Sequence, residues 1–128
     1  MQSPIQELVT RLSEAEAQLI PRWIPEKGFV NTKIKLNSPA STELLRRVDK
    51  LGLPSEYVEL LALSNGITLF QWTSAVDIFA GQLLAGEAAL GYFNSTSKFM
   101  GNFDSFPFFN MRDVGMVSFD LVHPGKLQ

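Results

Sequence analysis

The chain has 128 residues, of which 45% are hydrophobic and 19% charged, a length and composition that suit one globular domain with its own core. Its formal net charge of −2 argues against binding to nucleic acid through bulk electrostatics, which needs a basic face. The absence of cysteine excludes a disulfide framework and a thiolate metal site, and agrees with a cytoplasmic location. We expect no signal peptide and no membrane contact, because no basic stretch leads into an apolar run and no long apolar run occurs.

The first half predicts helices. A helix is expected over residues 4–20, because Ser3 suits its N-cap, Gln6 completes a capping box, and Pro21 cannot continue the helix. Residues 23–36 read as irregular, with a short strand at 32–36 where apolar residues alternate with lysines. A second helix is expected over residues 39–51, with Ser38 as its N-cap.

Residues 51–66 contain the signals of a third helix and its boundaries. Gly52 suits the left-handed end of the preceding helix, and Pro54 suits a first helical turn. Tyr57 and Leu61 recur at helical spacing and predict the buried face. Asn65 and Gly66 then predict a left-handed turn that leads into a strand.

The second half predicts strands over residues 67–72, 75–79 and 115–122, with residues 106–111 pairing with the last of these across a turn at 112–113. Residues 81–90 are ambiguous between a short helix and a loop. Residues 1–64 hold one phenylalanine and residues 65–128 hold nine. We therefore expect an α+β fold in one domain, helical over about 1–66 and sheet over about 67–128, with the N-terminal helices on one face of a twisted, mainly antiparallel sheet.

Few residues suggest catalysis. The single histidine, His123, stands beside a predicted turn. Ser118 and Asp120 lie two residues apart on one predicted strand, without the sharp turn that presents a nucleophile. A metal site at Asp120 and His123 has no third ligand nearby. We expect no enzyme activity, no cofactor and no metal.

Residues 99–109 hold five phenylalanines among glycine, asparagine, aspartate and proline. One interpretation places most of these rings in the core between sheet and helices. The other leaves one or two of them exposed as part of a partner-binding patch, because aromatic side chains are enriched at binding hot spots. The predicted patch has an acidic rim suited to a basic partner. It consists of Trp72, Asp77, Asp104, Phe106, Phe108 and Asp113.

The helix-and-turn pattern of residues 53–66 resembles the signature of the SUKH superfamily, which groups fungal cell-wall-synthesis regulators with bacterial immunity proteins that neutralise toxins. The matching residues are Leu53, Pro54, Tyr57, Leu61, Asn65 and Gly66, and their roles in this signature are structural. The resemblance implies a non-enzymatic protein-binding module, either an immunity protein that blocks a toxin domain, such as a basic nuclease, or a regulatory or scaffold domain.

The C-terminal part departs from the family pattern, in which a return strand and a helix follow the last strand predicted here. The sequence ends shortly after a turn at residues 123–125. An edge strand left unpaired invites association with another chain. Either the chain is a shortened form, or a partner or a second copy covers this C-terminal edge.

Overall fold

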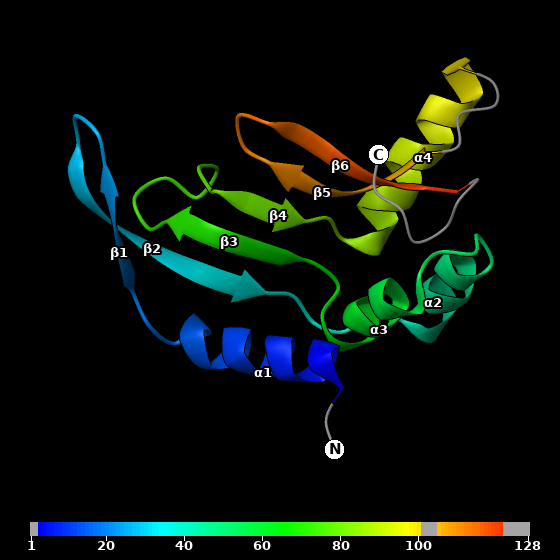
Figure 1. Cartoon of the computed structure of the whole chain (residues 1–128), viewed down its shortest axis with the longest axis horizontal. Coiled ribbons are helices and arrows are strands. Elements are labelled where there is room, and N and C mark those ends of the chain that lie inside the picture. The colour runs from blue at the N-terminus through cyan, green and yellow to red at the C-terminus, as the bar shows by residue number, and fades with distance from the viewer. Residues whose placement is uncertain (1–2, 101–104, 122–128) are drawn as a thin grey trace.

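A computed structural model describes residues 3–100 and 105–121, and its secondary structure confirms the α+β class. Six antiparallel strands form one sheet in chain order, and four helices accompany it (Figure 1). The elements are α1 (Pro4–Glu16), β1 (Ile20–Ile24), β2 (Gly28–Leu36), α2 (Thr42–Asp49), α3 (Ser55–Leu63), β3 (Ile67–Trp72), β4 (Gly81–Leu83), α4 (Gly86–Met100), β5 (Ser105–Met111) and β6 (Gly115–Asp120).

The sheet has one polar face and one apolar face. A polar row crosses its four central strands, and its members are Lys35, Thr68, Gln82 and Asn110. The adjacent row is apolar, and its members are Leu36, Ile67, Leu83 and Phe109. Because neighbouring positions of a strand point to opposite faces, the two rows assign the helices and the core to the apolar side.

The core lies between α2, α3, α4 and the C-terminal strands. Val48, Leu61 and Phe106 are fully buried, one each from α2, α3 and β5. The ring of Tyr57 lies 5.9 Å from that of Phe106, between centroids, in an edge-to-face arrangement. Aromatic rings thus join the helices to β5, as the core interpretation of the phenylalanine-rich segment predicts for Phe106.

The first half contains a β-hairpin that the sequence interpretation missed. The capping box of α1 is confirmed, since Gln6 N–H donates to Ser3 Oγ at 3.1 Å. However, α1 ends at Glu16, and residues 20–24 form a strand instead of the end of a helix and irregular chain. The short strand predicted over residues 32–36 is confirmed, but β2 begins earlier, at Gly28. Pro21 is tolerated there because β1 is an edge strand, which has backbone groups without a ladder partner.

The second half contains a helix, α4, which covers much of the ambiguous segment. The strand predicted over residues 75–79 is absent, and β4 forms at Gly81–Leu83 between β3 and β5. Only the strand at 67–72 has its predicted bounds. The division into a helical part and a sheet part is therefore wrong in detail, because the hairpin interrupts the first and α4 interrupts the second.

The second helix begins later than predicted. It spans Thr42–Asp49, and its N-cap is Ser41, whose Oγ accepts from Leu44 N–H at 3.1 Å. Ser38, the predicted N-cap, instead accepts a backbone hydrogen bond from Asn65 at 2.8 Å. Ser38 therefore joins the entry to α2 with the exit from α3.

The residues of the SUKH-like signature serve the fold. Leu53, Tyr57 and Leu61 are buried, and Gly66 has the left-handed φ of 116° that favours glycine. Of the two residues predicted to form the left-handed turn, Asn65 and Gly66, only Gly66 has a positive φ. Asn65 instead joins α3 to α4, because its Oδ1 accepts from Gly86 N–H at 2.7 Å.

Candidate functional site

The end of the sheet away from α2, α3 and α4 carries no helix, and three turns meet there (Figure 1). They are the β1–β2 turn, the β3–β4 loop and the β5–β6 turn. Between them lies a groove of about 490 Å³, within the size range of ligand sites. We call it the sheet-end groove; its lining residues are Arg22, Ile24, Lys27, Phe70, Trp72, Ile78, Phe79, Ala80, Arg112 and Asp113.

Unusual backbone conformations gather around this groove. Among the described residues, only Glu26, Phe70 and Asp113 have a positive φ without being glycine, at 71°, 55° and 67°. Phe70 and Asp113 line the groove, and Glu26 precedes the lining residue Lys27. Glu26 and Asp113 lie in hairpin turns, where a positive φ is common, whereas Phe70 has it within a strand. A positive φ costs free energy for a bulky residue, so Phe70 is the unusual position that draws attention to this groove.

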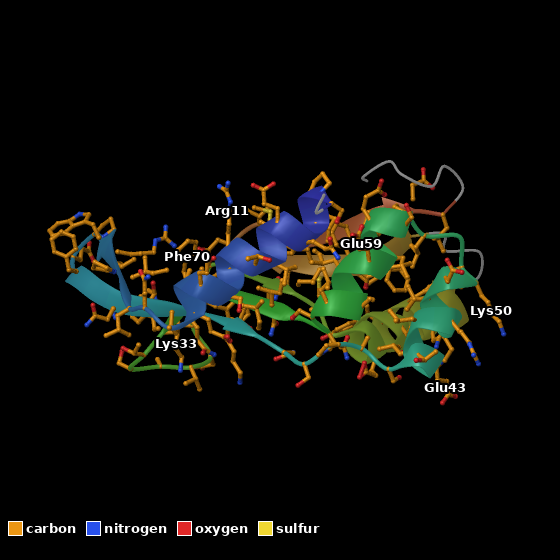
Figure 2. All side chains as sticks on the ribbon, turned by 90° about the horizontal axis from the view of Figure 1, so that it is seen from below. Arg11, Lys33, Glu43, Lys50, Glu59 and Phe70 are labelled. Atoms are coloured by element: carbon orange, nitrogen blue, oxygen red, sulfur yellow. The ribbon has the colours of Figure 1, made fainter. Side chains whose placement is uncertain are left out.

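A β-bulge places Phe70 at the groove. Lys33 pairs with Gln71 and Lys35 pairs with Thr68, so β3 has one more residue in this interval than β2. The extra residue changes the direction of the side chain. As Figure 2 shows, Phe70 and Lys33 point to opposite sides of the sheet.

The groove is mainly cationic and aromatic. The Arg22 guanidinium lies 4.6 Å from the centroid of the Phe70 ring, and the Lys27 ammonium lies 5.2 Å from that of Trp72. Arg112 adds a third cation, and Asp113 is the one carboxylate in the lining. Within residues 3–100 and 105–121, no carboxylate forms an ion pair with any of the three cations. The groove therefore offers positive charge to a ligand.

Backbone hydrogen bonds hold the walls of the groove in place. Trp72 N–H donates to the Ile78 carbonyl at 2.8 Å, which closes the β3–β4 loop across its base. Arg112 N–H donates to the Ala80 carbonyl at 3.1 Å, which fixes the β5–β6 turn beside that loop. Such fixed backbone limits the entropy lost when a ligand is bound.

The β1–β2 hairpin carries an exposed aromatic pair on its other face. Trp23 and Phe29 are opposite each other in the register, 64% and 75% exposed, with ring centroids 5.3 Å apart. Arg22 is the neighbour of Trp23, so it points to the groove side while the pair points away. The sequence interpretation missed the pair; aromatic residues placed on either side of residues 26–28 were the available signal.

The predicted aromatic and acidic patch does not form as a unit. Trp72 and Asp113 line the sheet-end groove, and Asp77 is exposed in the β3–β4 loop. Phe106 is 0% exposed, so its assignment to a binding patch was wrong. Phe108 stacks on a core ring, that of Phe119, with centroids 4.0 Å apart, and is absent from the groove. Asp104 lies outside the described residues.

The reason for this correction is the position of β5. Phe106 of this strand packs against rings of α3 and α4 and is fully buried, whereas Phe108 is half-buried and lines the apolar hollow beside Tyr57. Trp72 belongs to β3 and lies at the opposite end of the sheet, in a groove whose lining holds three cations and one carboxylate. The acidic rim expected around the aromatic residues is therefore not assembled there.

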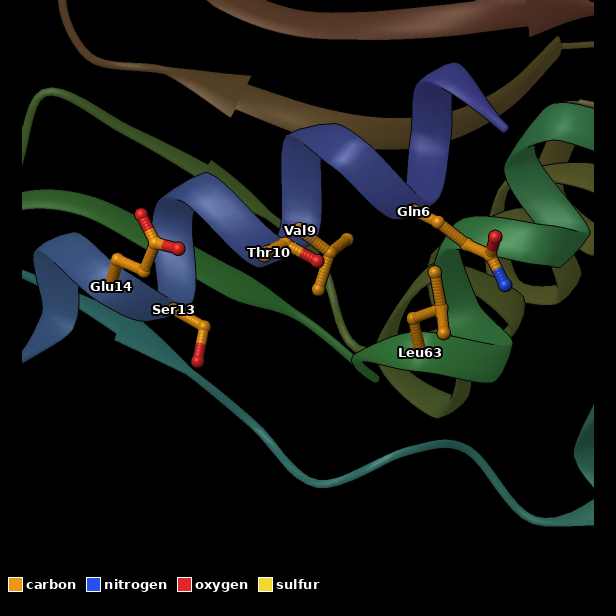
Figure 3. A pocket seen from close by; sticks show the side chains of 6 residues that line it. All are labelled: Gln6, Val9, Thr10, Ser13, Glu14 and Leu63. Atoms are coloured by element: carbon orange, nitrogen blue, oxygen red, sulfur yellow. The ribbon is translucent and has the colours of Figure 1, made fainter. Parts of the chain in front are cut away.

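Two further hollows have fewer charged side chains in their lining than the sheet-end groove. One lies along α1 and beside Leu63, where Figure 3 shows Gln6, Ser13 and Glu14 among the lining residues, with no cation. The other is apolar and adjoins Tyr57, whose buried hydroxyl has no hydrogen-bond partner among the described residues. Burial raises the pKa of the Tyr57 hydroxyl far above its usual value, so it is no acid or base near neutral pH.

The described part of the chain contains no group of three histidine, cysteine, aspartate or glutamate side chains placed to hold a metal ion. Among its helices, none is both long and apolar enough to span a membrane. His123, the chain's single histidine, lies outside the described residues.

Comparisons with protein-family models, with curated proteins and with solved structures gave no match. The resemblance to the SUKH superfamily therefore stays a prediction that rests on the residues of the signature.

Proposed function

We propose that this chain is a protein-binding module of the SUKH type, and that it acts as an immunity protein by covering a toxin domain. The observation that carries the proposal is the exposed Trp23–Phe29 pair on one face of the β1–β2 hairpin, whose opposite face carries Arg22 into the groove with unpaired cations. Exposed aromatic side chains grouped at one place are typical of binding surfaces, and tryptophan is enriched among residues that dominate binding energy. We call the pair together with the groove the sheet-end surface.

The mechanism is occlusion. Trp23 and Phe29 project from a hairpin at the edge of the sheet and bury their rings in an apolar recess of the partner. The cations of the groove add charge complementarity, which increases the rate of association and selects the partner. The charge of the groove favours an acidic surface of the toxin domain. The earlier expectation of a basic partner depended on an acidic rim around the aromatic residues.

Co-expression tests this proposal. An effector domain from a toxin gene that neighbours the gene for this chain is produced in a bacterial host with and without the chain, and growth and complex formation on a sizing column are measured. We expect rescue of growth and a stable complex. Absence of both would refute the immunity function, and a complex without rescue would favour the regulatory or scaffold alternative.

A double variant tests whether Trp23 and Phe29 lie in the interface with the effector domain. Trp23→Ala with Phe29→Ala is expected to weaken the complex by about 2 kcal/mol or more, as is typical of aromatic hot spots. Tyr92→Ala is the matched control, because Tyr92 is also an exposed aromatic residue, at 53%, but lies on α4. Equal effects of the two changes would show that the interface lies elsewhere.

A further inference from the structure

The sheet-end groove has a charge pattern that specifies the chemistry of its ligand more narrowly than the proposed function does. We propose that it binds an acidic segment of polypeptide, with carboxylates at Arg22, Lys27 and Arg112 and an apolar side chain against Ile78. The inference rests on the proposed function, since it names the part of the partner that enters the groove.

The first argument is the imbalance of charge in a chain whose net charge is −2. Eleven basic and thirteen acidic side chains are present overall, yet the lining of this groove holds three cations and one carboxylate. Within the described residues, none of those cations has a carboxylate partner. A local concentration of unpaired positive charge on an acidic protein favours a negatively charged ligand at this place.

The second argument is the way the cations are held. Arg22 lies over the Phe70 ring and Lys27 over the Trp72 ring, so cation–π contact restricts both side chains before any ligand arrives. The N–H groups of a guanidinium form a fork that a carboxylate can accept two at a time. This arrangement reduces the side-chain entropy lost on binding.

The third argument separates polypeptide from nucleic acid. Proteins that bind single strands use free aromatic faces on which bases stack. Here a cation covers one face of each ring, and both rings are half-buried. Asp113 in the lining and the nearby Asp77 would repel a continuous phosphate backbone, whereas separate carboxylates on a peptide can avoid them.

A defined peptide tests the inference without knowledge of the natural partner. The probe is the acetylated and amidated peptide DEFDE, and the matched neutral probe is NQFNQ. Binding is measured by calorimetry and by the fluorescence of Trp72 in a Trp23→Phe background, where it is the single remaining tryptophan. We expect the acidic probe to bind about tenfold more tightly than the neutral one at low salt, to lose affinity at high salt and to change the Trp72 emission.

Charge-matched variants show whether binding is local. Arg22→Gln with Arg112→Gln is expected to weaken binding of the acidic probe by about tenfold, at about threefold for each exposed charge. Lys33→Gln with Lys35→Gln removes the same net charge from β2 and is expected to have no effect, because Lys33 points to the other side of the sheet (Figure 2) and Lys35 belongs to its polar row.

Several outcomes would overturn the inference. Equal losses for the two double variants would show that attraction is not local to the groove, and equal affinity for the two probes would show that charge is not recognised. Tighter binding of single-stranded oligothymidylate than of the acidic peptide, at equal salt, would indicate nucleic acid.

The effector complex separates this inference from the proposed function. A complex that is unaffected by the Arg22 and Arg112 changes but lost in the Trp23 and Phe29 double variant would refute the acidic segment and leave the proposed function standing. Peptide binding at the groove without any effector complex would refute the proposed function and leave the binding of an acidic segment standing.

Discussion

The change Tyr57→Phe is predicted to stabilise this protein, although loss of a tyrosine hydroxyl usually destabilises a core. Tyr57 is 3% exposed, and its hydroxyl has no hydrogen-bond partner among the described residues. A buried hydroxyl without a partner costs about 1–3 kcal/mol relative to its hydration in the unfolded chain. Phenylalanine removes this cost and keeps the ring, which contacts the rings of Phe106, Phe108 and Phe119.

We expect the free energy of unfolding to rise by about 1 kcal/mol, and Tm by about 4 °C for a domain of this size. Urea denaturation with an unchanged m-value measures the first quantity, and calorimetry the second. Tyr92→Phe is the control, because Tyr92 is 53% exposed. That change is expected to alter the free energy of unfolding by less than about 0.5 kcal/mol.

The same hydroxyl predicts a pH dependence. Desolvation raises the pKa of Tyr57 far above its usual value of about 10. Above pH ~10 the unfolded chain therefore loses this proton while the folded chain keeps it, so stability falls as the pH rises. At pH ~11 the loss attributable to Tyr57 is about 1.4 kcal/mol, and the advantage of the phenylalanine variant grows by that amount.

Destabilisation of Tyr57→Phe by 1 kcal/mol or more would refute this reasoning, because it would mean that the hydroxyl has a strong partner in the folded protein. An advantage of the variant that stays constant from neutral to alkaline pH would refute the assignment of the pKa shift.

Four further predictions test the local structure. Gly66→Ala is expected to lower the free energy of unfolding by more than about 2 kcal/mol, measured by urea denaturation. A Cβ at this position would lie 2.6 Å from Asn37 Nδ2, and the backbone φ is 116°. Gly91→Ala, with nothing within 4 Å of the new Cβ in a helix interior, is expected to stabilise by about 0.5–1 kcal/mol instead. Ser41→Ala is expected to lower the free energy of unfolding by about 1 kcal/mol and with it Tm, because Ser41 is the N-cap of α2, whereas Ser38→Ala is expected to leave Tm unchanged. A lower Tm for Ser38→Ala alone would show that Ser38 is the N-cap. Phe106→Ala is expected to cost about 3–5 kcal/mol by thermal or urea unfolding, and a cost below 1 kcal/mol would contradict its burial in the core.

The predictions from sequence succeeded where neighbouring residues determine the structure. The capping box of α1 and the left-handed Gly66 were predicted, and both depend on contacts within a few residues of the chain. The strand at Ile67–Trp72 was predicted from its own run of β-forming residues. The predictions failed where the structure of a segment depends on pairing with a strand that is distant in the chain. Residues 20–36 form a hairpin beside β3, and the three-residue strand β4 exists because β3 and β5 flank it.

The same distinction applies to the site. Trp72 was recognised as a candidate, but its surroundings were predicted with the wrong sign of charge. The cations near it come from β1, from the β1–β2 turn and from the β5–β6 turn, which are far apart in the chain. Only the fold brings Arg22, Lys27 and Arg112 to one end of the sheet.

By itself the sequence determined the α+β class, the boundaries of α3 and the apolar identity of the core, because caps, turns and helical periodicity are local properties. The tertiary structure decided which aromatic residues are buried and which are exposed. Strand β5 lies against α3 and α4 and buries Phe106, whereas Trp23 of β1 and Phe29 of β2 lie on the face of the edge hairpin that points away from the core, which leaves both open to solvent. Side chains of similar chemistry thus serve the fold in one strand and are available to a partner in another, because burial depends on the place of the strand in the sheet.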